Sequence, residues 1–269
     1  MIDNEQTPLP FKPRRGLARG VVIFPSLITA SALFLGFYSI IFTLRYVEGI
    51  REASFSVAVY AIILAGVLDN LDGRIARLMK AESAFGLQFD SIADMVSFGV
   101  APAVMAYGFA LIELKRWGWL GAFLFLTCAA IRLARFNVLT SEAPSRKYFK
   151  GLSSPVAAGG LGVTLLMMKG YLHADHFHVA ALIATLAIAL LMVSNVRFRS
   201  FKDLNFKRQP IQYFLITLLL LIFVIEFGTE ALFFIFVVYL LSGLVEELVL
   251  FRRRRKSDPS TPFLPFGDR

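Results

Sequence analysis

Residues 69–94 of this chain read DNLDGRIARLMKAESAFGLQFDSIAD and carry four aspartates among apolar residues. Asp69 and Asp72 are three positions apart, and Asp90 and Asp94 are four apart. Either spacing places both carboxylates of a pair on one face of a helix. The short connection around residues 80–85 predicts a helical hairpin. Such a hairpin would gather the four carboxylates at one depth.

The composition places these helices in a membrane. The 269 residues are 57% hydrophobic and 17% charged, with a mean hydropathy of +0.67. A soluble domain is about 45–50% apolar and about 25% charged. The difference excludes an ordinary soluble enzyme and a disordered chain. The single cysteine, Cys128, excludes a disulfide scaffold.

Eight apolar segments approach the length of a membrane-spanning helix and predict an all-α, polytopic transmembrane bundle of about eight spans. They are residues 21–44, 55–77, 90–113, 117–137, 155–172, 178–196, 211–228 and 230–250. The last two are separated by Gly228 and Thr229 only, which leaves a tight hairpin or a re-entrant segment. We expect three regions: an N-terminal segment over 1–20, a transmembrane catalytic domain over 21–251, and a basic, then disordered tail over 252–269.

The distribution of Lys and Arg predicts the orientation. Alternate connections, counted from the N-terminus, carry most of these residues, and the run 252–256 ends the series. Because Lys and Arg favour the cytoplasmic side, we expect both termini and the aspartate cluster on the cytoplasmic side of the inner membrane. The net charge of +9 then reflects loops that face anionic lipid, and no nucleic-acid partner is expected.

Acidic side chains inside apolar segments are costly, so they indicate function. Four unpaired carboxylates would repel one another, and divalent cations that prefer oxygen ligands, such as Mg²⁺, Mn²⁺ or Ca²⁺, would resolve this repulsion. A pair of such ions is typical of phosphoryl transfer. Gly73, next to Asp72, would let a bulky ligand approach the backbone.

The spacing D-x2-D-G-x2-A-R-x8-G-x3-D-x3-D in residues 69–94 is similar, at every fixed position, to the signature of the CDP-alcohol phosphotransferase family. The stretches VSFGVAPAV (96–104), RLARFNV (132–138) and FKGLSSPVAAG (149–159) resemble its integral-membrane phosphatidylserine synthase branch. The resemblance implies the family fold, a homodimer, and transfer of a phosphatidyl group from CDP-diacylglycerol to L-serine, giving phosphatidylserine and CMP.

The resemblance also implies roles for individual residues. Two divalent cations, Mg²⁺ or Mn²⁺, would be held by Asp69, Asp72, Asp90 and Asp94. Asp94 would also act as the general base for the acceptor hydroxyl. The residues that match positions contacting the CDP-lipid are Asp69, Asp72, Gly73, Ala76, Arg77, Ser83 and Gly86.

Two stretches depart from the family pattern. Relatives usually carry Pro-Asn in the first helix, where this chain has Pro25-Ser26-Leu27-Ile28-Thr29, and Gly-Leu-Pro-Ser-Pro where it has residues 151–155, GLSSP. The acceptor pocket needs a cation for the serine carboxylate, preferably Arg. The candidates near the inner end of the fourth segment and before the fifth are Arg132, Arg135, Asn137 and Lys150.

Two alternatives stay open. The same chemistry could use another acceptor alcohol, such as glycerol 3-phosphate, inositol phosphate or choline. A cation or proton transporter could also use four carboxylates. Transporters often show inverted repeats and broken helices at the bilayer midplane, whereas this chain shows no repeat and its acidic cluster lies near the interface.

Overall fold

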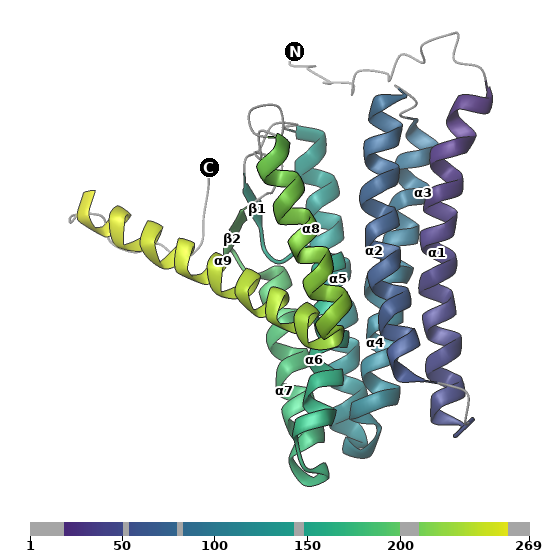
Figure 1. The fold of residues 1–269 in the computed structure, drawn as a ribbon, viewed down its shortest axis with the longest axis vertical. Coiled ribbons are helices and arrows are strands. Elements are labelled where there is room, and N and C mark those ends of the chain that lie inside the picture. The colour runs from purple at the N-terminus through teal and green to yellow at the C-terminus, as the bar shows by residue number, and fades with distance from the viewer. Residues whose placement is uncertain (1–18, 51–53, 80–82, 143–147, 200–209, 258–269) are drawn as a thin grey trace, which may run out of the picture.

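The computed structural model describes residues 19–50, 54–79, 83–142, 148–199 and 210–257. This part of the chain is a helical bundle with one small two-stranded ribbon (Figure 1). The helices are α1 (Arg19–Val47), α2 (Phe55–Leu78), α3 (Ala84–Met95), α4 (Ala101–Ala106), α5 (Arg116–Glu142), α6 (Ser154–Tyr171), α7 (Ala174–Val193), α8 (Pro210–Phe227) and α9 (Thr229–Ser257). The strands are β1 (Tyr148–Lys150) and β2 (Arg197–Arg199), which pair antiparallel.

All eight predicted apolar segments are helical, which confirms the all-α transmembrane class. Within the described residues, six helices are long and apolar enough to cross a membrane. They are Pro25–Val47, Phe55–Leu78, Ala84–Leu114, Arg116–Val138, His176–Val193 and Thr229–Glu247. The other two predicted segments form α6 and α8. Helix α6 is less apolar because it contains glycines, Ser154 and Lys169, and ten of its residues are buried by neighbouring helices.

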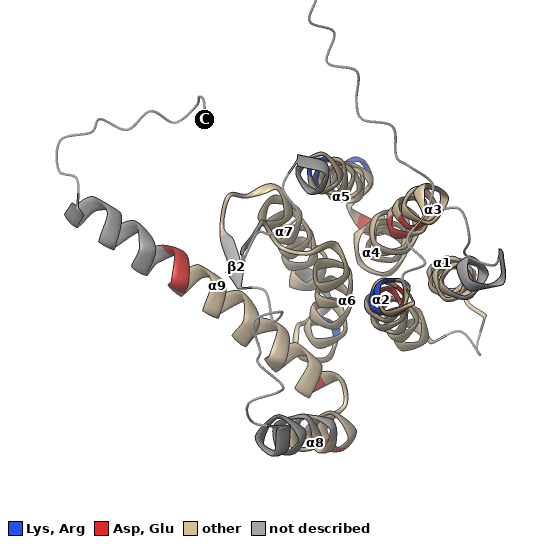
Figure 2. Ribbon diagram, turned by 90° about the horizontal axis from the view of Figure 1, so that it is seen from above, with Lys and Arg blue, Asp and Glu red and all other residues tan. Residues whose placement is uncertain are grey.

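Helix α6 occupies the middle of the bundle. Viewed along the bundle axis, it lies between α2 and α7, with α9 running beside it (Figure 2). Ten of its residues are buried, from Ser154 to Leu165. Its small residues allow this closeness: a Cβ added to Gly162 would come within 2.8 Å of Val59 on α2. Close backbone approach at small residues is how membrane helices gain packing energy.

The continuous helical span from Ala84 to Leu114 is not a uniform α-helix. Two π-helical turns interrupt it, at Val96–Val100 and at Tyr107–Leu111, and a short 3-10 turn ends it at Ile112–Leu114. Pro102 follows the first π turn, and its nitrogen carries no hydrogen for the carbonyl one turn earlier. The first π turn begins two residues after Asp94, at the kind of position where such turns accompany functional sites.

Tight connections fix the ends of the later helices. Gly228, with φ +53°, is the one residue between α8 and α9, so the last two predicted segments form a tight hairpin. Gly151, with φ +85°, follows β1 and donates its N–H to the Val196 carbonyl at 2.8 Å. This contact holds the start of α6 against the end of α7.

The predicted region boundaries are only partly visible. Helix α9 continues through Ser257, so the predicted boundary at 251/252 lies inside a helix and the basic run 252–256 extends it. Residues 1–18 and 258–269, which make up most of the two predicted terminal segments, lie outside the described residues.

The contact between α1 and the first π turn generates a stability prediction. A Cβ added to Gly36 would lie 2.7 Å from the Ser97 Cα, a backbone atom that cannot move aside cheaply. We therefore expect Gly36→Ala to destabilise the protein by about 1–3 kcal/mol, measured as a lower Tm in detergent. The matched control is Gly170→Ala in α6, where nothing lies within 4 Å of an added Cβ. A Gly36→Ala protein as stable as the Gly170→Ala control would contradict this account of the contact.

Candidate functional site

The aspartates of α2 and α3 converge as the hairpin predicts. One carboxylate oxygen from each of Asp69, Asp72 and Asp90 lies within 4.8 Å of the other two. Asp72 is buried, with 4% of its surface exposed, and Asp69 and Asp90 are half-buried. Three carboxylate oxygens so close together fit a hard divalent cation, which also removes their mutual repulsion.

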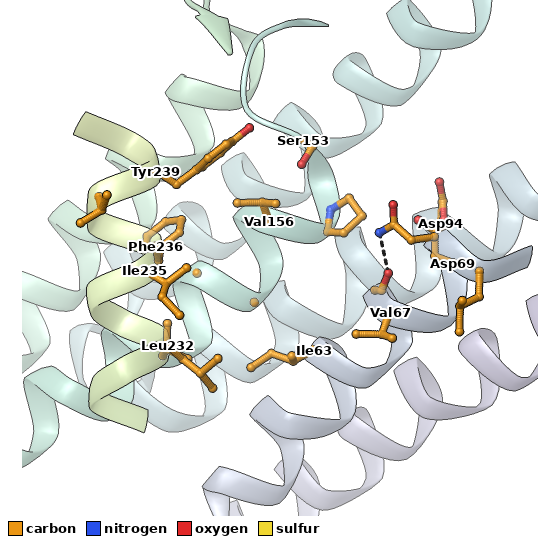
Figure 3. Close-up of a pocket in the computed structure, with 18 of the residues that line it drawn as sticks. Ile63, Val67, Asp69, Asp94, Ser153, Val156, Leu232, Ile235, Phe236 and Tyr239 are labelled. Atoms are coloured by element: carbon orange, nitrogen blue, oxygen red, sulfur yellow. Dashed lines mark hydrogen bonds between the residues drawn. The ribbon is translucent and has the colours of Figure 1, made fainter. Parts of the chain in front are cut away.

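Asp94 lies one turn beyond Asp90 and outside this trio. Its side chain lies beside that of Asp69 and close enough to Arg132 for an electrostatic interaction. The sequence predicted four carboxylates at one depth. In the structure three of them form a close group, and the fourth, Asp94, lies beside this group and interacts electrostatically with Arg132 of α5. Figure 3 shows Asp69 and Asp94 side by side at one end of the pocket.

Thr29 of α1 positions the most buried of these carboxylates. Its hydroxyl donates to Asp72 Oδ2 at 2.7 Å and lies 3.2 Å from the Pro25 carbonyl. Thr29 is 6% exposed, and its branched Cβ restricts the side chain to few rotamers. The bond therefore fixes the orientation of the Asp72 carboxylate, which leaves its other oxygen for the trio.

Arg132 brings a half-buried positive charge to the site, whose lining also includes the exposed Arg74. Its Nη1 donates to Ser154 Oγ, on the first turn of α6, at 2.8 Å. Its guanidinium carbon is 5.8 Å from the centre of the Phe136 ring, and it interacts electrostatically with Asp94 and Asp69. A guanidinium presents five N–H donors in a planar fork, so the Ser154 bond uses only part of its capacity.

These groups open onto one cavity of about 1280 Å³. Asp69, Asp90, Asp94 and Arg132 line its polar end, together with Ser153. Its apolar end extends between α2, α6 and α9, where Ile63, Val156, Leu232, Ile235 and Phe236 line the wall (Figure 3). The cavity therefore joins a charged pocket to an apolar chamber, which suits a ligand with a charged head and a hydrocarbon chain.

Beyond the aspartates, the predicted nucleotide-contacting residues are partly exposed, and Gly73 and Arg77 are the most open of them. An added Cβ at Gly73 would meet nothing within 4 Å, so its face of α2 is open. Arg77 donates from Nε to the Gly73 carbonyl at 2.8 Å. Ser83 caps α3 by accepting from the Gly86 N–H at 3.0 Å. Ala76 is half-buried on the same helix as Gly73.

The predicted acceptor residues separate in the structure. Arg132 lines the cavity, whereas Arg135 donates to Asn195 Oδ1 at 3.0 Å, and Asn137 donates to Ser91 Oγ at 3.1 Å. Neither Arg135 nor Asn137 is among the described residues that line the cavity. Lys150 ends β1, and its side chain lies outside the described part.

Three contributors to the site were missed as functional residues. Thr29 and the GLSSP stretch that holds Ser154 were noted only as departures from a pattern, and Tyr239 of α9, which also lines the cavity, was not noted. Thr29 carried little signal, because a threonine inside a helix commonly bonds the carbonyl four residues earlier, as Thr29 does with Pro25. Tyr239 carried none, because interfacial and buried tyrosines look alike in sequence.

Comparisons with known proteins find related sequences. The sequence profile described as CDP-alcohol phosphatidyltransferase matches residues 22–193. A protein of Helicobacter pylori (strain ATCC 700392 / 26695) named CDP-diacylglycerol–serine O-phosphatidyltransferase is 35% identical over 85% of this chain and 92% of its own length. A Saccharomyces cerevisiae protein of the same name is 40% identical over 51% of each chain. An archaetidylserine synthase of Methanothermobacter thermautotrophicus is 32% identical over 66% of this chain and 70% of its own.

The Thr29–Asp72 bond generates a prediction about cation binding. Thr29→Val removes the donor but keeps the shape of the side chain, and a hydrogen bond to a charged group contributes about 1.5–3 kcal/mol. We expect Thr29→Val to bind Mn²⁺ about tenfold more weakly or worse, measured by electron paramagnetic resonance on purified protein. Thr29→Ser keeps a hydroxyl and should bind close to wild type. Equal Mn²⁺ affinity in wild type and Thr29→Val would refute the positioning role.

Proposed function

Because this chain belongs to the CDP-alcohol phosphatidyltransferase family, we propose that it is an integral-membrane CDP-diacylglycerol–serine O-phosphatidyltransferase. It transfers the phosphatidyl group of CDP-diacylglycerol to L-serine, giving phosphatidylserine and CMP. The observation that carries this proposal is the cluster of Asp69, Asp72 and Asp90 at the charged end of a cavity whose other end is apolar. Such a cavity accepts a phosphorylated lipid.

The names of the relatives support serine as the acceptor. The Helicobacter and Saccharomyces proteins are named for CDP-diacylglycerol and serine, and the Methanothermobacter protein is named for archaetidylserine. The lipid part differs among these names, whereas serine is common to them. The conserved element of the function is therefore the acceptor, which we carry over to this chain.

The aspartates would hold the metal. We assign Asp69, Asp72 and Asp90, with Asp94 beside them, to two divalent cations, Mg²⁺ or Mn²⁺. Bound there, such ions neutralise the pyrophosphate and the charge that develops on the leaving phosphate. Thr29 contributes by keeping the Asp72 carboxylate in one orientation.

Asp94 is the residue we assign as general base. It accepts the proton of the serine hydroxyl while the serine oxygen forms a bond to the phosphorus that carries diacylglycerol. The bond from that phosphorus to the bridging oxygen breaks, and CMP leaves with the electron pair. Asp94 lines the cavity, so a bound alcohol can reach it, as a general base requires.

The remaining residues position the two substrates. Gly73, Ala76, Arg77, Ser83 and Gly86 lie on or beside the open side of the α2–α3 hairpin, where we place the cytidine nucleotide. Arg132 is assigned to the serine carboxylate because a guanidinium can bind a carboxylate with two parallel bonds. Arg135 and Asn137 support α5 through Asn195 and Ser91, and Lys150 remains a candidate for lipid phosphate or acceptor.

We further propose that the protein acts in the inner (cytoplasmic) membrane as a homodimer, with both termini and the aspartates on the cytoplasmic side. The charge distribution of the connections supports this orientation, and CDP-diacylglycerol and serine meet there at the membrane surface. Labelling of single-cysteine variants in intact cells tests the orientation directly, starting from a chain whose one native cysteine is the buried Cys128.

The central test measures CMP release from CDP-diacylglycerol by purified protein with Mg²⁺ or Mn²⁺. We expect serine to support release, a chelator to abolish it, and Asp94→Asn to reduce kcat about 10²–10⁴-fold, since that is what a general base contributes. Mn²⁺ binding, measured separately, distinguishes loss of the base from loss of the metal.

Glu113→Gln, at an exposed site in the 3-10 turn, is the control for removing one carboxylate. Its CMP release should match wild type. Serine-dependent release that persists in Asp94→Asn would remove Asp94 from the mechanism. Release only with glycerol 3-phosphate, an inositol phosphate or choline would keep the chemistry and discard serine as the acceptor.

A further inference from the structure

Helix α9 forms one wall of the cavity although it lies beyond the part of the chain that the family profile matches. The profile ends at residue 193, and α9 begins at Thr229. Nevertheless, four of the ten residues labelled in the pocket close-up lie on α9: Leu232, Ile235, Phe236 and Tyr239 (Figure 3). The cavity is therefore completed by a segment that the family-wide signature does not describe.

The position of α9 is set by contacts with α6 and α2. Phe236 is 7% exposed and lies against Gly160, where any added Cβ would overlap its ring. At the start of α9, the Tyr60 hydroxyl is 2.8 Å from Thr229 Oγ1, and the Tyr171 hydroxyl donates to Glu230 at 3.1 Å. Three separate contacts thus hold α9 against the rest of the bundle.

Tyr239 follows Phe236 by three residues, a spacing that places both on one face of the helix. Because Phe236 faces Gly160, Tyr239 also faces the bundle. It lines the cavity near its polar end, with its hydroxyl directed toward the Ser153 side of the pocket (Figure 3), and it interacts electrostatically with Arg132. Arg132 in turn is bonded to Ser154 on the same α6 that supports Phe236.

We propose that the Tyr239 hydroxyl is a specificity-determining contact for the acceptor, donating to its carboxylate beside the Arg132 guanidinium. The inference rests on the proposed function, since it assumes an acceptor that carries both a hydroxyl and a carboxylate. Arg132 interacts electrostatically with both Asp94 and Tyr239, and the three residues line one cavity, so a small acceptor whose carboxylate is held by Arg132 and Tyr239 would direct its hydroxyl toward Asp94.

A carboxylate bound beside Arg132 and Tyr239 would accept hydrogen bonds from both side chains. A guanidinium supplies charge-assisted bonds, and a phenol adds a neutral donor without a second positive charge. A phosphorylated acceptor carries more negative charge and would call for a further cation; among the described lining residues the other guanidinium is that of Arg74, on α2. A site built to hydrogen-bond one group rejects analogues that lack it, because its polar groups are left unpaired.

The test compares Tyr239→Phe with wild type in the CMP-release assay, using serine and ethanolamine, which lacks the carboxylate. We expect the KM for serine to rise about tenfold, as loss of a bond to a charged group produces, with the KM for CDP-diacylglycerol within about twofold. The preference for serine over ethanolamine, as a ratio of kcat/KM, should fall by the same factor.

The matched control is Tyr60→Phe, which removes a tyrosine hydroxyl that contacts the first residue of α9. An equal rise in the serine KM in both variants would show that the placement of α9 matters and not the Tyr239 hydroxyl, and would overturn the proposal. A rise in the KM for CDP-diacylglycerol alone would assign Tyr239 to the donor and overturn it also.

Failure of the proposed function is recognised separately. Wild-type protein that releases CMP only with an alcohol lacking a carboxylate would reject serine as the acceptor before any variant is measured, and the role of Tyr239 would fall with it. Wild-type protein that uses serine, together with a Tyr239→Phe protein of unchanged serine KM, would reject the role of Tyr239 and leave the proposed function intact.

Discussion

The arrangement of this protein depends on the cost of bringing carboxylates together inside an apolar bundle. Asp69, Asp72 and Asp90 offer oxygens within 4.8 Å of one another, at a position where charged groups lose much of their hydration. Such a cluster persists only if other groups compensate for the lost hydration and the repulsion. Thr29 does so by hydrogen bonding and Arg132 by charge, and a divalent cation suits the remainder. The packing of α1, α2, α3 and α5 is the arrangement that brings these groups together.

Helix α6 links the two ends of the site. Its first turn holds Arg132 through Ser154, and its glycine-rich middle accepts Val59 from one side and Phe236 from the other. Because bulky side chains are absent from this surface, α2 and α9 approach it from opposite sides. The charged pocket and the apolar chamber are therefore parts of one cavity. The family-matched region supplies the acidic residues, and the C-terminal hairpin supplies about half of the apolar lining.

The part of the site that could be predicted is the part that depends on local periodicity. The spacing within 69–94 and its short connector place four aspartates on two facing helices, and the structure brings three of them together with the fourth adjacent. The bonds from Thr29 to Asp72 and from Arg132 to Ser154 span 43 and 22 residues, and no periodicity specifies them. Hydropathy likewise identifies apolar helices but not their neighbours. It therefore could not show that α6 is central, that Tyr239 and Arg132 line the same cavity, or that Arg135 and Asn137 do not line it.

The π turn at Val96–Val100 has a consequence for how this helix can vary. A π turn accommodates one residue more than an α turn, and each residue added to an α-helix rotates everything beyond it by about 100°. The turn absorbs that rotation between Asp94 and the buried helix α4 that begins at Ala101. The π turn therefore changes the angle, about the helix axis, between the face that carries the aspartates and the face that packs against α1 and α6. Substitutions that repack the deeper half of this helix need not turn the carboxylates away from the site.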